Sequence, residues 1–140
     1  MELLKRKFYA VFLVIMLATI SSCAMFGNDT GTSYENGYYS TTMKHSYNEV
    51  YDATIEAIKT GETYDSSGST YDIKLNKKTD EAAVIEAFSN RDRSDYLEVV
   101  IKPESDKLTR LSIKYGSQGN SIRSSALEDI IDGNIKYGNL

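Results

Sequence analysis

At 140 residues, 26% of them charged, the chain is long enough for one domain with a modest core. Its 20 acidic and 16 basic residues give a formal net charge of −4, so we expect no nucleic-acid partner. A single cysteine excludes a disulfide within the chain, which must therefore depend on its core for stability.

The N-terminal segment has the order of a secretory signal. Lys5, Arg6 and Lys7 precede an uncharged, mostly apolar run over residues 8–20. A helix of that length spans about 20 Å, short of the roughly 30 Å hydrocarbon core, which argues against a stable transmembrane helix. Basic residues, a short apolar run and then small residues predict a signal peptide over residues 1–22.

The end of this segment, Ile20-Ser21-Ser22-Cys23, resembles the bacterial lipobox. The resemblance implies cleavage before Cys23 and acylation of that cysteine, whose acyl chains would make a membrane its partner. Ala24 in the next position, in place of an aspartate, implies a lipid-anchored protein of the outer membrane that faces the periplasm. The alternative is an incidental cysteine at the end of an uncleaved anchor.

Residues 23–36 are rich in Gly, Ser, Thr, Asn and Asp and lack an apolar period. We interpret them as the acylated cysteine and a flexible tether, which would keep the folded part close to the membrane. A single α+β domain is then expected over residues 37–140.

The domain is predicted to begin with a strand over residues 37–44 and a helix over residues 47–59. Ser46 and Glu49 have the spacing of a capping box, and Gly61 is a suitable stop. A Gly- and Ser-rich loop is expected over residues 63–70.

Four further segments alternate apolar and polar residues: 71–76, 83–88, 96–101 and 110–115. Tyr71, Ile73 and Leu75 are expected on one side of the first, and Pro103 is expected to end the third. Short turns between successive strands predict an antiparallel meander with one dry face and one wet face.

A second helix is expected after the polar segment 116–120. Its predicted apolar stripe is formed by Ile122, Ala126, Ile130 and Ile131, with Leu127 beside it, and its acids Glu128, Asp129 and Asp132 are expected in solvent. The element order β-α-β-β-β-β-α favours a five-stranded antiparallel sheet with both helices packed on one face. Ferredoxin-like and helix-grip sheets are the neighbouring alternatives.

With the lipobox, the segments 47–59 (YNEVYDATIEAIK), 83–87 (AVIEA) and 111–120 (LSIKYGSQGN) resemble the small bacterial lipoproteins grouped as domain of unknown function 3568. The resemblance covers most of residues 37–135, and the polar loop 63–70 departs from the usual pattern. It implies a lipoprotein domain that faces the periplasm, and it transfers no catalytic residue.

No catalytic residue, metal site or cofactor is predicted. His45 is the sole histidine, and the sequence offers it neither a nucleophile elbow nor further metal ligands. The carboxylate pairs Asp80/Glu81, Asp92/Asp95 and Glu104/Asp106 fall at predicted turns, where acidic residues favour the backbone geometry. The segment 116–120 is explained better as a turn and helix cap than as an anion site.

Tyrosines are the candidate binding residues, because aromatic side chains only half needed by a core often mark binding surfaces. We single out Tyr38, Tyr39 and Tyr71; the alternative is that they are simply strand formers. We therefore expect a lipid-anchored envelope protein that is not an enzyme and that binds or scaffolds another envelope protein or a glycan. The alternative is a small periplasmic ligand carrier or hydrolase with a pocket between sheet and helices.

Overall fold

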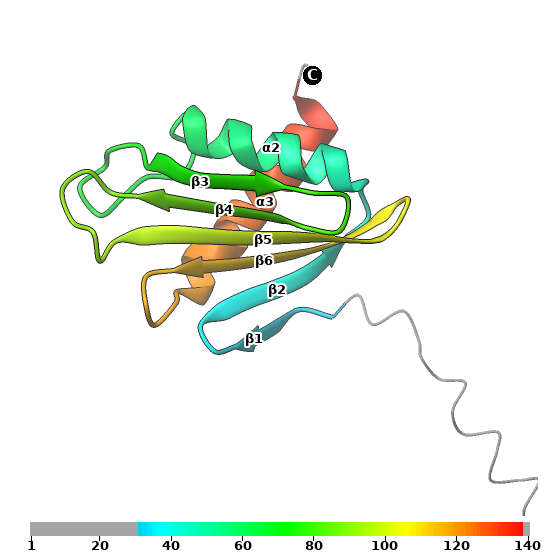
Figure 1. The fold of residues 1–140 in the computed structure, drawn as a ribbon, viewed down its shortest axis with the longest axis horizontal. Helices are drawn as coiled ribbons and strands as arrows, with labels where there is room; N and C mark the ends of the chain where they lie inside the picture. The colour runs from blue at the N-terminus through cyan, green and yellow to red at the C-terminus, as the bar shows by residue number, and fades with distance from the viewer. Residues whose placement is uncertain (1–30, 139–140) are drawn as a thin grey trace, which may run out of the picture.

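The computed structural model describes residues 31–138 as an antiparallel sheet with two helices behind it, an α+β fold (Figure 1). The elements are β1 (Ser33–Glu35), β2 (Tyr38–Met43), α2 (Tyr47–Lys59), β3 (Asp72–Lys78), β4 (Ala83–Phe88), β5 (Tyr96–Ser105), β6 (Leu108–Tyr115) and α3 (Ser121–Tyr137). The predicted leader, Cys23 and the tether up to residue 30 lie outside the described residues.

The sheet has six strands in the order β1-β2-β6-β5-β4-β3, so the prediction of five was wrong. After β2, helix α2 crosses behind the sheet to the far edge, where β3 begins a meander that returns strand by strand to β6 (Figure 1). Strand β6 then pairs with β2, placing Thr41 opposite Leu111. Helix α3 follows and packs against α2 on the same face of the sheet.

The additional strand, β1, lies within the segment predicted to be tether. Asn36 and Gly37 both have positive φ, at 53° and 82°, and Glu35 pairs with Tyr38 across them. A two-residue turn with positive φ at both positions is the type I′ turn, which suits a twisted hairpin and favours Asn-Gly. This turn folds β1 back onto β2.

The predicted meander is confirmed, and its alternation separates two faces of the sheet. Side chains on one face of β4, β5 and β6 are completely buried against the helices: Ala83, Ile85, Ala87, Leu97, Val99, Ile101, Leu111 and Ile113. Their neighbours in sequence lie on the opposite face, which neither helix covers (Figure 1).

Two details of the meander differ from prediction. Strand β5 continues through Pro103 to Ser105, because its pairing with β4 ends at Ile101 and the proline interrupts no ladder on that side. In β3, the register shifts between Ile73 and Leu75. This bulge turns Leu75 out of the predicted inner face, and its side chain is 39% exposed.

Helix α2 begins as predicted, since Ser46 and Glu49 form a reciprocal capping box. Helix α3 is rotated relative to its predicted stripe. Leu127 and Ile131 are buried in the core, whereas Ile122 is 80% exposed. Ser124 is also buried and lies against the backbone of β6, so a small polar residue occupies the face where the pattern predicted an apolar one.

Candidate functional site

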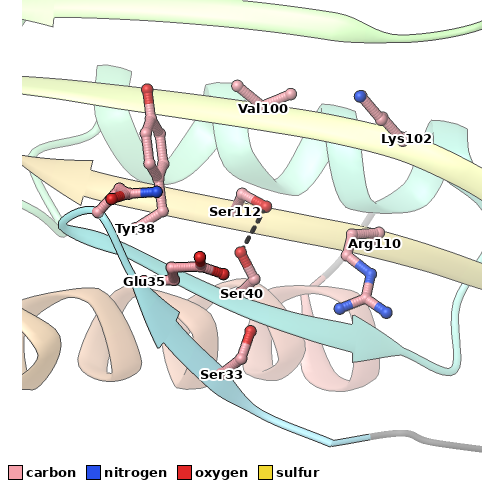
Figure 2. A pocket seen from close by; sticks show the side chains of 9 residues that line it. Ser33, Glu35, Tyr38, Ser40, Val100, Lys102, Arg110 and Ser112 are labelled. Carbon is pink, nitrogen blue, oxygen red and sulfur yellow. Dashed lines mark hydrogen bonds between the residues drawn. The ribbon is translucent and has the colours of Figure 1, made fainter.

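The face of the sheet opposite the helices carries the candidate site. At its β1 end, a hollow of about 400 Å³ extends across four adjacent strands, β1, β2, β6 and β5 (Figure 2). Nine residues line it: Ser33, Glu35, Asn36, Tyr38, Ser40, Val100, Lys102, Arg110 and Ser112. The two-residue turn thus brings β1 and its polar side chains to the edge of this hollow.

The floor of the hollow is hydroxyl-rich. Ser40 on β2 and Ser112 on β6 are directly paired residues, and their Oγ atoms lie 2.8 Å apart, in hydrogen-bond contact (Figure 2). On one side, the hydroxyl of Tyr38 donates to a carboxylate oxygen of Glu98 at 2.5 Å. Cross-strand pairing fixes these positions, so the floor is rigid.

Charged groups lie toward the β5 side. Arg110 Nε donates to Glu104 Oε1 at 2.9 Å, and Thr42 donates to the other oxygen of Glu104 at 3.2 Å. Lys102 projects from the neighbouring strand and is exposed. Such a lining can hold a ligand through hydrogen bonds and charge.

The protonation state of the phenol at the hollow is well defined. Burial and the hydrogen bond to Glu98 raise the pKa of Tyr38 from 10.0 to about 12. Tyr38 is therefore a neutral donor throughout the physiological range, and Lys114 Nζ lies 5.0 Å from the centre of its ring.

Comparison with known families identifies the family of the chain. A family model described as a protein of unknown function (DUF3568) matches residues 6–134. The chain belongs to this family. The match includes every residue that lines the hollow. No curated protein matches the chain.

The structure does not bring the three predicted binding tyrosines of this DUF3568 chain together. Tyr38 lies at the hollow, but Tyr39, its neighbour on β2, lies on the helix side and donates to Glu128 of α3 at 2.5 Å. Burial and this bond raise the pKa of Tyr39. Tyr71 is only 4% exposed and donates to Asp95 at 2.5 Å. Glu128, expected in solvent, thus has a specific partner.

Tyr71 belongs to a second cluster, at the end of the sheet near the start of α3. Arg123 Nη2 donates to the Tyr71 hydroxyl at 2.9 Å and to the carbonyl of Tyr64. Its guanidinium carbon lies 4.1 Å from the centre of the Tyr115 ring. A smaller hollow of about 190 Å³ lies beside this arginine, between α3 and the loop after α2.

The electrostatics of this cluster favour an ionised Asp95 beside a neutral Tyr71. Burial alone would raise the pKa of Asp95, but hydrogen bonds from Tyr71 and Ser66 and the charge of Arg123 lower it overall. Burial and the bond to Asp95 raise the pKa of Tyr71 well above 10.0, despite the opposing effect of Arg123. Because all these polar groups have partners, the cluster fits a structural role that fastens the loop after α2 to α3.

Among the remaining sequence candidates, only Glu104 and Asp95 contact either place. His45 Nε2 lies 2.7 Å from Asp132 Oδ1, and Lys136 binds the other oxygen of Asp132 at 2.6 Å. Asp80, Glu81, Asp92 and Asp106 lie at turns, whereas Asp95 binds Tyr71 and Glu104, which is still within β5, binds Arg110. The segment 116–120 forms a turn in which Asn120 caps α3 through the backbone N–H of Arg123.

Two general properties complete the description of this DUF3568 domain. Residues 31–138 contain no group of three or more His, Cys, Asp or Glu side chains that could hold a metal ion. Over the same range, neither helix is both long and apolar enough to cross a bilayer.

Sequence reasoning missed most of the hollow. It weighed Tyr38 as a binding residue but did not consider Ser33, Lys102 or Arg110 together. Their convergence depends on β6 pairing with β2, which joins residues about 70 positions apart. The local signal that was available is Asn36-Gly37, which predicts the hairpin and hence the position of β1.

Proposed function

We propose that this DUF3568 chain is a lipid-anchored envelope protein whose folded domain is a non-catalytic binding module. The observation that carries the proposal is the asymmetry of the sheet. One face is filled by the two helices, while the other carries the hollow of about 400 Å³ with polar and charged side chains at its lining. The polar residues of this face can form hydrogen bonds and ion pairs with a ligand, and we expect them to bind another component of the envelope.

The anchor rests on the sequence. The basic start, the apolar run over residues 8–20 and the motif ending at Cys23 support acylation of that cysteine, and we assign the protein to the outer membrane, facing the periplasm. Residues 24–32 can span at most roughly 30 Å when fully extended. Because Ser33 already lines the hollow, the binding site would lie within that reach of the bilayer.

The anchor is tested by replacing its cysteine. The full chain should incorporate labelled palmitate and enter the detergent phase, and Cys23→Ala should lose both properties. Ser22→Ala keeps a small residue before the cysteine and should retain them. A Cys23→Ala product that is still processed and still enters the detergent phase would overturn the anchor.

The binding surface is tested by site-specific photo-cross-linking in intact cells. A photoreactive residue in place of Ser112, on the hollow, should give discrete adducts of higher mass. The matched control is Asp52, which is exposed on α2 on the other side of the molecule. Equal adduct patterns from both positions, or none from Ser112, would contradict binding at this face.

A further inference from the structure

The lining of the hollow indicates the chemistry of its ligand. Hydroxyls of Ser33, Ser40 and Ser112, the amide of Asn36 and the carboxylate of Glu35 surround one space (Figure 2). Together they offer many donors and acceptors at fixed spacing, since four of the five residues lie on paired strands. This is the complement of a ligand that carries several hydroxyl groups.

The charges of the hollow are uneven. The side chain of Lys102 makes no hydrogen bond or ion pair with any residue between 31 and 138, and the side chain of Arg110 uses only its Nε to bind Glu104 among the same residues. Lys102 is therefore the cation of the hollow that has no partner among the described residues, and Arg110, which is paired with Glu104, lies opposite it on β6. An ammonium group without such a partner, next to a guanidinium whose Nη groups bind nothing else among residues 31–138, favours an anionic group on the ligand.

Two side chains of the lining offer apolar contacts. Val100 is a half-buried side chain on β5, and the ring of Tyr38 extends from the start of β2 toward β5 (Figure 2), where its hydroxyl donates to Glu98. These can contact the C–H groups of a sugar ring while the hydroxyls and charged groups around them bind its polar substituents.

We infer that the hollow binds a saccharide that carries a carboxylate. Its hydroxyls hydrogen-bond to the serines, Asn36 and Glu35, and its carboxylate lies between Lys102 and Arg110. This inference rests on the proposed function and names the ligand class of the same site. A hollow of about 400 Å³ lies within the range usual for small-molecule sites, roughly 300–1,000 Å³.

The test uses the full chain in detergent micelles and amide chemical shifts measured by NMR. Digalacturonate is the acidic probe, maltose the neutral one, and acetate the carboxylate without a sugar. Digalacturonate should shift the amides of Ser40 and Ser112, and Lys102→Gln should raise its Kd about tenfold, because a charge-assisted hydrogen bond is lost. Maltose should bind more weakly than digalacturonate, and its Kd should not change in Lys102→Gln.

Lys107→Gln is the matched control, since it removes the same charge from the exposed β5–β6 turn, outside the hollow. Its Kd for digalacturonate should stay within about twofold of wild type. Equal affinity for digalacturonate and maltose would overturn the role of the carboxylate. Equal affinity for acetate would overturn saccharide recognition.

Failure of this inference can be told apart from failure of the proposed function. If no saccharide shifts the amides at the hollow but a protein still cross-links to position 112 in cells, the ligand class is wrong and the binding module stands. If both experiments fail, the open face is not a binding surface.

Discussion

Gly119 lies where two backbone segments touch, and its lack of a side chain allows the β1–β2 turn to pack on the β6–α3 turn. Its φ is 75°, and a Cβ built there would collide with the backbone of Gly37. We expect Gly119→Ala to lower the free energy of unfolding by about 1–3 kcal/mol, from backbone strain and displacement of the hairpin. Thermal unfolding of the full chain measures this.

Gly68→Ala separates the two causes. Gly68 has a similar φ of 80°, but a Cβ there would meet nothing within 4 Å. Gly68→Ala should therefore lower the free energy of unfolding only by the backbone strain of an alanine at positive φ. If Gly119→Ala is no more destabilising than Gly68→Ala, the contact between the two turns contributes nothing to stability.

Asp65 is a buried carboxylate that organises the loop after α2. Its Oδ1 accepts from the backbone N–H groups of Ser67 and Ser69, and its Oδ2 accepts from the hydroxyl of Ser89 at 2.6 Å. The hydrogen bonds from the side chains of Ser89 and Ser67 hold the pKa of Asp65 far below its usual range. This loop is therefore fixed by one ionised group.

The depressed pKa of Asp65 predicts a pH dependence with a definite sign. Its stabilising contribution is complete above the unfolded value, near 4, and is lost as the pH falls toward the lower folded value. Asp65→Asn should unfold at lower urea concentration than wild type at pH 7, and the gap should narrow on acidification below pH 4. Asp92→Asn, in an exposed turn with similar bonds to Ser94, should have a smaller effect at pH 7. A gap for Asp65→Asn that is constant from pH 7 to pH 2 would contradict this account.

At the scale of elements, helix α3 offers the sharpest comparison between pattern and packing. Leu127 is completely buried, so Leu127→Ala should cost about 2–5 kcal/mol of unfolding free energy in urea denaturation. Ile122 is 80% exposed, and Ile122→Ala should stay within about 0.5 kcal/mol of wild type. If Ile122→Ala lowered the free energy of unfolding more than Leu127→Ala, the stripe predicted from the sequence would be the buried face.

The strands of the meander were predictable because each needs only local alternation and a polar turn. The prediction was wrong where a residue's burial or a strand's length depends on a segment far away in the sequence. Ser124 faces β6 and is buried despite its polarity, and β5 continues past Pro103 because β4 ends before it. The strand β1 is different, since the adjacent Asn36-Gly37 pair does predict its turn and was overlooked in a polar segment.

The candidate site was less predictable than the fold. Tyr38 could be singled out from composition, but its neighbours from β5 and β6 are separated from it in the sequence by a helix and two or three further strands. Arg123 gave no signal, because a single arginine in a polar helix segment does not reveal that it will lie on a tyrosine ring. The position of the hollow's lining and that of Arg123 both depend on how distant segments pair and pack, which the sequence alone does not specify.

At the scale of the whole molecule, tyrosines join its layers. Tyr39 connects β2 to α3, and Tyr47 connects α2 to the β3–β4 turn. Tyr115 connects β6 to the loop after α2 through Thr63, and Tyr71 connects that loop to the β4–β5 loop through Asp95. Each phenol is partly buried and uses its hydroxyl for a specific bond, so the sheet and helices are fastened by polar contacts around an aliphatic core. Ionisation of these phenols should therefore loosen the whole fold.

A loss of stability at alkaline pH is expected from these partly buried phenols. Burial is the largest cause of the raised pKa of Tyr38, Tyr39, Tyr47, Tyr71 and Tyr115. A phenol whose folded pKa is raised contributes stability that is complete below the unfolded value, near 10, and is lost as the pH rises through the folded value. We therefore expect unfolding free energy to fall steadily above pH 10.

Spectrophotometric titration of the full chain checks this directly. Tyrosinate absorbance of the native chain should lag behind that of the chain in urea, and the lag should end when the fold is lost. Tyr38→Phe removes the group whose pKa is raised to about 12, so it should reduce the lagging amplitude by one tyrosine of the 11 in the chain. Superimposable native and urea titrations would mean that the phenols are not held neutral by the fold, and the polar fastening of sheet to helices would then lose its physical basis.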